Sequence, residues 1–447
     1  MKDQHTQFVC QQCGYSTPQW FGKCPNCGEW NSLVEFKDST KTQNLKLKTQ
    51  IYEKNLPLKL GEIKMTAKDR ISTGIEEFDR VLGGGIVPGS VVLVAGEPGI
   101  GKSTLLLQLT ESLSSKFPPN RRVQSSKLLY VSGEESPEQI KIRAERLGIK
   151  GENLSLLNET NVDAILEEIS EYPNIFLIVD SIQTLWTQDL AGTAGSIGQV
   201  RECAARLINF CKPKGIPLFL VGQVTKEGAI AGPMTLAHMV DVVLFLEGER
   251  FQSLRLLRGI KNRFGPTDEA GVFEMTDKGM IGVENPSKLF LGENSSNRRA
   301  GSVTFCAMEG TRPILVEIQA LVTKSFLAVP RRVANGFDYN RLVMLTAVLQ
   351  KSLNLPLWDQ DIYLNIAGGF KVGEPAADLA VCLAIISSFK NKPLPEKTCA
   401  FGEVGLLGEI RRVSYEEKRE KEAKRMGFEK IISSKKSSSL LDLRFKF

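Results

Sequence analysis

The sequence predicts an α/β protein of two or three domains, with a small cysteine-rich unit before the α/β region and an α+β region after it. Three observations lead to this fold class. The chain has 447 residues, more than one ordinary domain holds. Short apolar runs alternate with helical patterns over residues 67–283, which is typical of a parallel sheet covered on both faces. Two C-x-x-C pairs lie close together within the first 27 residues.

The composition is that of an ordinary globular protein, with 42% hydrophobic and 24% charged residues. The net charge of +6 permits a polyanionic partner but does not require one. No apolar run reaches the ~18 residues that a transmembrane helix needs. The first residues also lack the apolar core of a signal peptide. We therefore expect a cytoplasmic protein with no membrane association.

The two cysteine pairs at the N-terminus are ten residues apart and comprise Cys10, Cys13, Cys24 and Cys27. A glycine follows each pair, so each is expected to form a tight knuckle with both thiolates directed to one spot. Four thiolates make the tetrahedral site that Zn²⁺ prefers. A redox dithiol or two disulfides are the alternatives, but these rarely occur as a doubled, regular pair in so small a unit. Structural zinc is the expected occupant.

Aromatic and basic side chains surround these cysteines: Trp20, Phe21, Lys23 and Trp30. We expect them to cover the metal site and to offer a surface to a partner, either DNA or protein. The other five cysteines are scattered in mostly apolar sequence, which favours free, buried thiols. They are Cys203, Cys211, Cys306, Cys382 and Cys399.

Changes of composition predict the domain boundaries. The zinc unit is expected over residues 1–36, a lysine-rich linker over 37–66, the α/β domain over 67–283 and the last domain over 284–447.

Apolar runs predict the strands within these domains. The α/β domain is expected to contain strands over 90–95, 128–131, 175–179, 217–221 and 242–245. The last domain is expected to contain strands over 301–305 and 314–318 and helices over 340–349 and 376–387.

A complete phosphate-binding loop of the form G-x-x-x-x-G-K-S follows the first of these strands. Its glycines allow the backbone N–H groups to surround a triphosphate at a helix N-terminus. Lys102 is expected to reach the β- and γ-phosphates of ATP, and the Ser103 hydroxyl to bind Mg²⁺. The residues expected to hold the nucleotide are Gly96, Glu97, Pro98, Gly99, Ile100, Gly101, Lys102, Ser103 and Thr104.

Polar side chains at the ends of other predicted strands complete this site. Asp180 ends an apolar strand and is expected to bind Mg²⁺ through its water shell. Gln223 ends another strand, where its amide would sense the γ-phosphate; plain polarity at a strand end is an almost equal alternative.

Two acidic residues follow the strand over 128–131. A carboxylate there could orient and polarise the water that attacks the γ-phosphate. Glu134 is the first candidate and Glu135 the second. Because Ser136 and Pro137 predict the start of a helix, the alternative is an ordinary acidic residue at a helix N-terminus.

Several motifs give the chain a specific resemblance. The stretches over 70–74, 82–90 and 132–136, together with the phosphate-binding loop, look like a RecA-type ATPase core. The pentapeptide Lys261-Asn262-Arg263-Phe264-Gly265 follows that core and precedes a Lon-protease-like domain. This order, with four cysteines in front, resembles the RadA (Sms) family of bacterial DNA repair proteins up to about residue 432. The last fifteen residues match no part of the pattern.

The resemblance implies a ring helicase of the DnaB type, in which a hexamer holds each ATP between two subunits. It implies that Lys261 and Arg263 act as catalytic residues across that interface, on a neighbour's nucleotide or on DNA. It also implies a partnership with the recombinase RecA. Composition alone shows a local basic cluster, Arg255, Arg258, Lys261 and Arg263, for which a solvated face is the simpler interpretation.

The stretch over 368–378 looks like the nucleophile segment of Lon-type peptidases, with Ala376 in place of the serine. Glu417 stands where the catalytic lysine is expected. An alanine cannot attack a carbonyl, so we expect a proteolytically inactive scaffold.

The same domain is expected to carry a basic strip with one aromatic residue. Contact with phosphates and an ordinary charged surface are equally good interpretations of its members. They are Lys324, Arg331, Arg332, Tyr339 and Arg341.

Together with these motifs, the resemblance implies a DNA-dependent ATPase that acts as a ring-shaped motor on single-stranded or branched DNA. Such a motor would promote branch migration and process recombination intermediates in DNA repair. An ATP-dependent peptidase is the alternative from another class, and Ala376 opposes it. A regulatory ATPase like KaiC leaves the zinc unit and the Lon-like domain unexplained. A zinc-binding transcription factor leaves the phosphate-binding loop unexplained.

Overall fold

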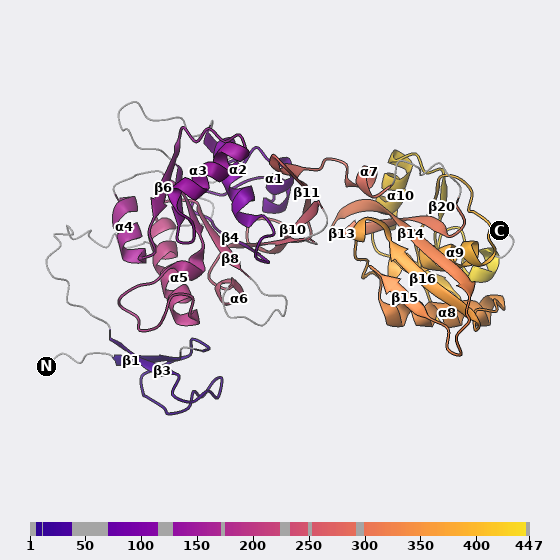
Figure 1. The fold of residues 1–447 in the computed structure, drawn as a ribbon, viewed down its shortest axis with the longest axis horizontal. Helices are drawn as coiled ribbons and strands as arrows, with labels where there is room; N and C mark the ends of the chain where they lie inside the picture. The colour runs from indigo at the N-terminus through magenta and orange to yellow at the C-terminus, as the bar shows by residue number, and fades with distance from the viewer. Residues whose placement is uncertain are drawn as a thin grey trace, which may run out of the picture. The chain divides into compact units, whose positions relative to one another are not determined.

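The computed structural model describes residues 6–10, 12–37, 70–114, 128–170, 175–223, 233–248, 253–291 and 299–443 (Figure 1). The expected linker over 37–66 lies outside the described residues, apart from Lys37. The chain divides into two compact units, one formed mainly by residues 1–248, 253–267 and 271–282 and the other mainly by 283–447.

A three-stranded antiparallel sheet forms the cysteine-rich part of the chain. Its central strand β1 (Thr6–Cys10) pairs with β2 (Ser16–Thr17) and with β3 (Leu33–Lys37). Its buried cluster contains Cys10, Cys24 and Leu33, with Phe8 and Cys13 packed against it. Such a small apolar cluster cannot offset the entropy lost on ordering about 30 residues, and we therefore expect this unit to need a bound metal to fold.

In the described part of the chain, nine strands form the large sheet of the first unit, in the order β12-β11-β10-β9-β4-β8-β7-β5-β6. Six of these strands run parallel, which confirms the predicted parallel sheet. They are β4 (Val91–Gly96), β5 (Leu128–Ser132), β6 (Leu154–Asn158), β7 (Phe176–Asp180), β8 (Leu218–Gln223) and β9 (Val242–Glu247).

Three further strands extend this sheet beyond β9, and none of them was predicted from the apolar runs. They are β10 (Leu254–Asn262), β11 (Ala270–Thr276) and β12 (Gly279–Gly282). β10 pairs antiparallel with β9, and β12 pairs antiparallel with β11. Because β10 runs antiparallel to β9, it begins beside the carboxyl end of β9 and finishes beside its amino end.

Helices cover both faces of the sheet, as predicted (Figure 1). One buried cluster joins Val92 and Val94 of β4 to the first three helices. A second cluster joins Val91 and Leu93 to the next two. Successive side chains of a strand point to opposite faces, so β4 contributes to both cores. The helices are α1 (Glu76–Leu82), α2 (Lys102–Ser114), α3 (Pro137–Arg146), α4 (Val162–Ser170) and α5 (Ile197–Cys211), followed by the short α6 (Pro233–Leu236).

The second unit is built on a six-stranded mixed sheet in the order β15-β16-β14-β13-β17-β20. The long hairpin of β13 and β14 confirms the two strands predicted in this region. The strands are β13 (Ser302–Glu309), β14 (Arg312–Lys324), β15 (Arg332–Asn335), β16 (Gln360–Ile366), β17 (Thr398–Ala400) and β20 (Lys430–Ile432). A separate pair joins β18 (Glu403–Val404) to β19 (Ile410–Arg411).

Both predicted helices of this unit are confirmed, as α8 (Tyr339–Leu353) and α9 (Asp378–Phe389). The residues of α9 from Asp378 to Ser387 are all buried, so this helix forms the core of the unit. Two further helices are α7 (Pro286–Phe290) and α10 (Glu416–Arg425). Among the described residues, none of the helices has the length and apolar character needed to cross a membrane.

Candidate functional site

The parallel strands bring the predicted nucleotide-site residues to one edge of the sheet, here called the carboxyl edge. Gly96, at the end of β4, is level with Gln223, at the end of β8. Ser132 at the end of β5 is level with Asp180 at the end of β7, and Glu134 follows Ser132 by two residues. Ligands of open α/β sheets bind at this edge, because the loops that follow the strands converge there.

The phosphate-binding loop connects β4 to α2 at the carboxyl edge. At two of its glycines, a Cβ atom would come too close to a neighbouring residue. A Cβ atom at Gly96, where φ is +156°, would lie 2.4 Å from the carbonyl oxygen of Leu246. A Cβ atom at Gly101, where φ is +114°, would lie 2.7 Å from the Met275 side chain. Pro98 and Gly99 are exposed at the tip, so the loop is open to a ligand.

Lys102 is the first residue of α2, and Ser103 and Thr104 follow it in the first turn. The Lys102 Nζ donates hydrogen bonds to the backbone carbonyl oxygens of Gly96 (2.9 Å) and Glu97 (2.8 Å). Burial lowers the pKa of Lys102, and the charges of Asp180 and Glu134 oppose this shift. The ammonium group therefore lies inside the loop and near both acidic residues of the site.

Asp180 and Glu134 have different partners at the carboxyl edge. The Tyr130 hydroxyl donates a hydrogen bond to Oδ2 of Asp180. Burial, together with the charge of Asp180, raises the pKa of Tyr130, so this hydroxyl keeps its proton. The Glu134 carboxylate accepts hydrogen bonds from the Ser181 hydroxyl (2.5 Å) and from Nε2 of Gln223 (3.0 Å). The structure thus brings Lys102, Asp180, Glu134 and Gln223 together.

Glu135 takes a structural position instead. Its carboxylate forms an ion pair with Arg143 of α3. Ser136 caps the same helix, with Gln139 as the reciprocal partner of a capping box, and Pro137 is its first residue. The predicted helix start is therefore confirmed.

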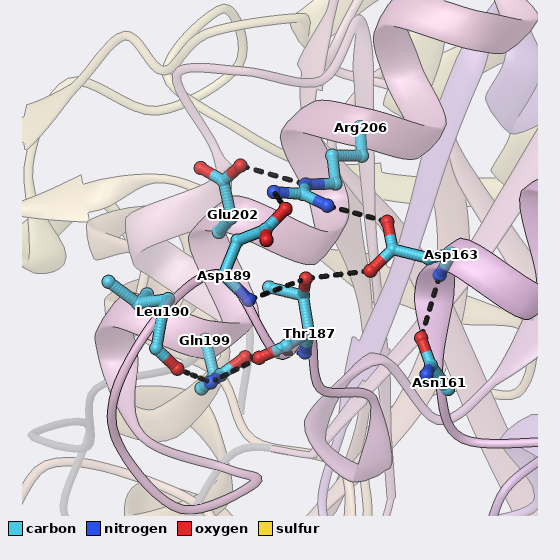
Figure 2. Close-up of polar contacts among 8 residues, drawn as sticks. All are labelled: Asn161, Asp163, Thr187, Asp189, Leu190, Gln199, Glu202 and Arg206. Atoms are coloured by element: carbon cyan, nitrogen blue, oxygen red, sulfur yellow. Dashed lines mark hydrogen bonds and ion pairs between the residues drawn. The ribbon is translucent and has the colours of Figure 1, made fainter. Parts of the chain in front are cut away.

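The segment that follows Asp180 is held by an arginine that the sequence analysis did not single out (Figure 2). Arg206 of α5 donates hydrogen bonds to Oδ1 of Asp163 (2.5 Å), Oδ2 of Asp189 (2.7 Å) and Oε1 of Glu202 (2.9 Å). Burial opposes the charge of Arg206, but these three carboxylates outweigh it and raise the arginine's pKa. The one sequence signal was the i,i+4 spacing of Glu202 and Arg206.

A buried amide completes the attachment of this segment. The Gln199 side chain accepts a hydrogen bond from the backbone N–H of Thr187 (2.9 Å) and donates to the carbonyl oxygens of Thr187 (3.1 Å) and Leu190 (2.5 Å). The Thr187 hydroxyl donates to Asp163 (2.8 Å). Figure 2 shows both contact sets side by side, so α4 and α5 fix the chain shortly after Asp180.

Lys261 and Arg263 lie at the opposite edge of the sheet, where the parallel strands begin, here called the amino edge. In the antiparallel pair, Lys261 is opposite Val243 and Asn262 is opposite Val242, and Val242 is level with Val92 near the start of β4. Along the sheet, Lys261 is level with Leu93, about 10 Å from Gly96 at 3.3 Å per residue, and Arg263, two residues further along the chain, is about 17 Å from it.

At the amino edge, Lys261 donates to the carbonyl oxygens of Ala237 (2.6 Å) and Val240 (2.8 Å). Burial lowers the pKa of Lys261, and the charge of Arg263 adds to this shift. Arg263 forms an ion pair with Asp241 (3.1 Å), and its side chain is 53% exposed.

The basic residues of this region do not form one cluster. Arg255, at the other end of β10, is buried and donates from Nε to the carbonyl oxygen of Ile100 in the phosphate-binding loop (3.2 Å). Arg258 of β10 forms an ion pair with Glu247 of the neighbouring strand β9. Because β10 is extended, residues that are close in sequence reach opposite edges of the sheet.

The four N-terminal cysteines form the site that their spacing predicted. All four sulfur atoms lie within 4.8 Å of one another. A tetrahedral zinc site with Zn–S bonds of about 2.3 Å requires sulfur atoms about 3.8 Å apart, so this donor set fits Zn²⁺. The two knuckles are closed by hydrogen bonds from Gly14 N–H to Cys10 O and from Gly28 N–H to Cys24 O, both 2.9 Å.

The aromatic residues of this unit lie mainly in solvent. The exposed fractions are 55% for Trp20, 41% for Phe21 and 68% for Trp30. Leu33 and Phe8 pack against Cys10 and Cys24 instead. Trp20, Phe21 and Trp30 are not part of the buried cluster around Cys10 and Cys24, and much of their surface is open to a partner. The other five cysteines are free and buried, as predicted.

In the second unit, Ala376 is buried in a short 3₁₀ turn and accepts a hydrogen bond from Gly402 N–H (2.8 Å). Beside it, the fully buried Arg419 forms an ion pair with Glu374. Glu417 is exposed on α10. At the position that was predicted to carry an alanine in place of a peptidase serine, the structure has a buried methyl group.

Two members of the predicted basic strip have internal partners. Arg341 donates from Nε to Oδ1 of the buried Asp378 (2.7 Å). Arg332 donates to the Leu357 carbonyl oxygen (2.8 Å). Lys324, Arg331 and Tyr339 are exposed. The surface available for phosphates is therefore smaller than the sequence indicated.

Family models match three parts of the chain. Residues 8–35 match a rubredoxin metal-binding domain, and residues 57–229 match an AAA domain. Residues 344–437 match the model of subunit ChlI of Mg-chelatase.

Curated relatives match almost the whole chain. The DNA repair protein RadA of Bacillus subtilis is 49% identical over 429 residues, which cover 96% of this chain and 92% of the relative. RadA of Aquifex aeolicus is 48% identical, with 96% and 93% covered. RadA of Streptococcus pyogenes serotype M1 is 47% identical over 443 residues, with 99% and 95% covered. The zinc ribbon, the AAA domain and the Lon-like domain follow each other as the motifs predicted, and the chain belongs to the RadA family of DNA repair proteins.

Proposed function

We propose that this protein is a DNA-dependent ATPase that works as a ring-shaped motor on single-stranded or branched DNA during repair. The observation that supports this most directly is the carboxyl edge of the large sheet. A phosphate-binding loop, a lysine, two carboxylates and an amide converge there from four parallel strands. Membership of a DNA repair family makes DNA the expected polyanion, and the positive net charge is compatible with it.

The ATP site would use residues of the loop in distinct roles. Backbone N–H groups from Gly96 to Thr104 would bind the phosphates at the N-terminus of α2. Lys102 would exchange its two carbonyl acceptors for the β- and γ-phosphate oxygens, a small movement because its ammonium group already lies inside the loop. Arg255 would keep the loop in place through Ile100.

Magnesium would supply charge neutralisation on the phosphates when bound. Ser103 offers a hydroxyl, and Asp180 offers a carboxylate whose position is set by the Tyr130 hydroxyl. These are oxygen ligands of the kind that Mg²⁺ prefers. Glu134 would orient the attacking water and accept its proton. Gln223 would contact the γ-phosphate and, through its hydrogen bond to Glu134, couple the presence of that phosphate to the position of the carboxylate.

Lys261 and Arg263 would act on the nucleotide bound by a neighbouring subunit. Their place at the amino edge supports an action in trans, since their own loop lies at the far end of β4. A cation brought to the γ-phosphate from outside lowers the barrier to phosphoryl transfer. Lys261 would first have to leave the carbonyl oxygens of Ala237 and Val240, whereas the Arg263 side chain is already half exposed.

The remaining parts of the proposal concern assembly and partners. The chain would form a hexamer, work with RecA, promote branch migration and act in the cytoplasm without membrane contact. The domains would be residues 1–36 for the zinc ribbon, 37–66 for the linker, 67–283 for the ATPase and 284–447 for a proteolytically inactive scaffold. Ala376 supports the last assignment because a methyl group cannot attack a carbonyl.

ATP turnover by the purified full-length protein, with and without single-stranded DNA, tests the central proposal. The Lys102→Ala variant provides the blank. We expect DNA to raise kcat several-fold and Lys102→Ala to remove turnover under both conditions. Turnover that does not respond to single-stranded or branched DNA would exclude the motor and favour a regulatory ATPase of the KaiC kind.

A further inference from the structure

Asp241 connects three elements at the amino edge of the large sheet. It follows the turn after α6 and precedes β9, and its carboxylate is 5% exposed. Oδ1 accepts hydrogen bonds from Lys212 Nζ (2.8 Å) and from Arg263 (3.1 Å). Oδ2 accepts from the backbone N–H of Val91, the first residue of β4 (3.1 Å).

The backbone reinforces these contacts. The Asp241 N–H donates to the Val91 carbonyl oxygen (3.0 Å), and the Arg263 N–H donates to the Asp241 carbonyl oxygen (3.1 Å). Asp241 therefore holds both the backbone and the side chain of Arg263. Among the residues of the pentapeptide, Asn262 also serves the fold, because its amide donates to the carbonyl oxygens of Val81 and Leu82.

The Arg263 guanidinium, by contrast, remains 53% exposed while it is held. An exposed arginine samples many side-chain conformations, and most of this conformational entropy must be lost when the group reaches a fixed target. A buried carboxylate that restricts the arginine beforehand reduces this loss and sets the direction in which the group points.

We propose that Asp241 is a positioning residue, which orients Arg263 towards the nucleotide of a neighbouring subunit and links it to the start of the strand that ends in its own phosphate-binding loop. This inference rests on the proposed action of Arg263 in trans. Asp241 itself is not expected to touch a nucleotide, because its carboxylate is 5% exposed and its own loop lies at the carboxyl edge.

Asp241→Asn separates the positioning role from the fold. The side-chain amide is almost isosteric, and its oxygen can still accept the hydrogen bond from Val91 N–H. Its NH₂ group would face Arg263 and Lys212, so the two cations lose their carboxylate. Lys212→Met is the matched control, since it removes the second cation on Asp241 and leaves Arg263 paired.

The experiment compares steady-state ATP turnover of the full-length protein with single-stranded DNA for Asp241→Asn, Arg263→Ala, the double variant and Lys212→Met. We expect Arg263→Ala to lower kcat most, Asp241→Asn to lower it about tenfold with KM changed less than about twofold, and Lys212→Met to leave both unchanged. The double variant should be no slower than Arg263→Ala, because the two residues act as one unit.

Mixing variants provides a readout that a merely structural defect does not change. Lys102→Ala subunits carry an intact Asp241 and Arg263, so adding them to Asp241→Asn subunits should restore turnover at the intact loops of the latter. If asparagine prevents folding, Asp241→Glu, which keeps the charge but displaces the carboxylate, is expected to give the same defect and the same rescue.

The outcomes distinguish the two proposals. If Arg263→Ala leaves kcat unchanged, the action in trans is wrong, and the role of Asp241 is overturned with it. If Arg263→Ala lowers kcat but Asp241→Asn does not, or if their effects multiply in the double variant, only the positioning role is overturned. An equal loss of turnover in Lys212→Met and in Asp241→Asn would also overturn the positioning role. It would show that the Asp241 carboxylate acts through its ion pair with Lys212 and not through Arg263.

Discussion

Two adjacent residues with the same chemistry have different interaction partners in this structure. Glu134 and Glu135 are adjacent carboxylates after the same strand, and the sequence could only rank them. In the structure, Glu134 accepts hydrogen bonds from Ser181 and Gln223 at the carboxyl edge, whereas Glu135 forms an ion pair with Arg143 of α3. A carboxylate that is already neutralised by an arginine is a poor general base, so the geometry favours Glu134.

Glu134→Gln should lower kcat for ATP about 100-fold or more, because it removes the group that orients the attacking water and accepts its proton. Nucleotide affinity should change little, since the phosphates are held by the loop and Lys102. Single-turnover hydrolysis and binding of a fluorescent ATP analogue measure the two quantities. Glu135→Gln is the control and should keep kcat within a few-fold. If Glu135→Gln lost more kcat than Glu134→Gln, Glu135 would be the residue that activates the water and Glu134 would have the structural role.

At the scale of elements, helices hold in place the segments that connect the strands and that carry residues of the candidate site. The segment after β7 carries Ser181, a partner of Glu134, and then continues to Thr187 and Asp189, which α4 and α5 hold through Asp163, Gln199 and Arg206 (Figure 2). Residues that no motif marks therefore position the catalytic edge. β10 acts similarly, because it carries Arg255 at one edge and Lys261 at the other.

Arg206→Met should lower the free energy of unfolding of the first unit by about 1–2 kcal/mol, since three carboxylates then lie close together without their cation. The loss should decrease at high salt, because screening weakens the remaining repulsion. Urea denaturation at two salt concentrations measures both effects. Arg146→Met, at an exposed site near the end of α3, is the control and should cost less than 0.5 kcal/mol. Equal losses in the two variants would show that the carboxylates do not depend on Arg206.

On the scale of the whole molecule, the cysteine-rich unit and the ATPase use different means to stay folded. The large sheet buries apolar side chains on both faces, whereas the ribbon's buried cluster contains only Cys10, Cys24 and Leu33 among its described residues. Burial of a few side chains contributes only a few kcal/mol, so four metal–thiolate bonds must supply the rest.

Removal of zinc with a strong chelator should therefore unfold the ribbon and leave the nucleotide site intact. We expect the fluorescence of Trp20 and Trp30 to change with metal release, while affinity for a fluorescent ATP analogue stays within about twofold. Lys102→Ala should bind a full complement of zinc, because its defect is confined to the loop. Loss of nucleotide binding on chelation, or loss of zinc in Lys102→Ala, would show that the two parts do not fold independently.

Several features of this protein depend on short-range patterns and follow from local sequence alone. The cysteine spacing, the phosphate-binding loop, the buried strands and the helices α8 and α9 are all set by a few adjacent residues, and each lies where it was predicted. Long-range contacts, in contrast, set which strand ends meet, add β10 to β12 to the sheet and separate Lys261 and Arg263 from their own loop. The reason is physical: strand order and side-chain partners such as Asp241 and Arg206 arise from contacts between segments far apart in sequence, which no local pattern encodes.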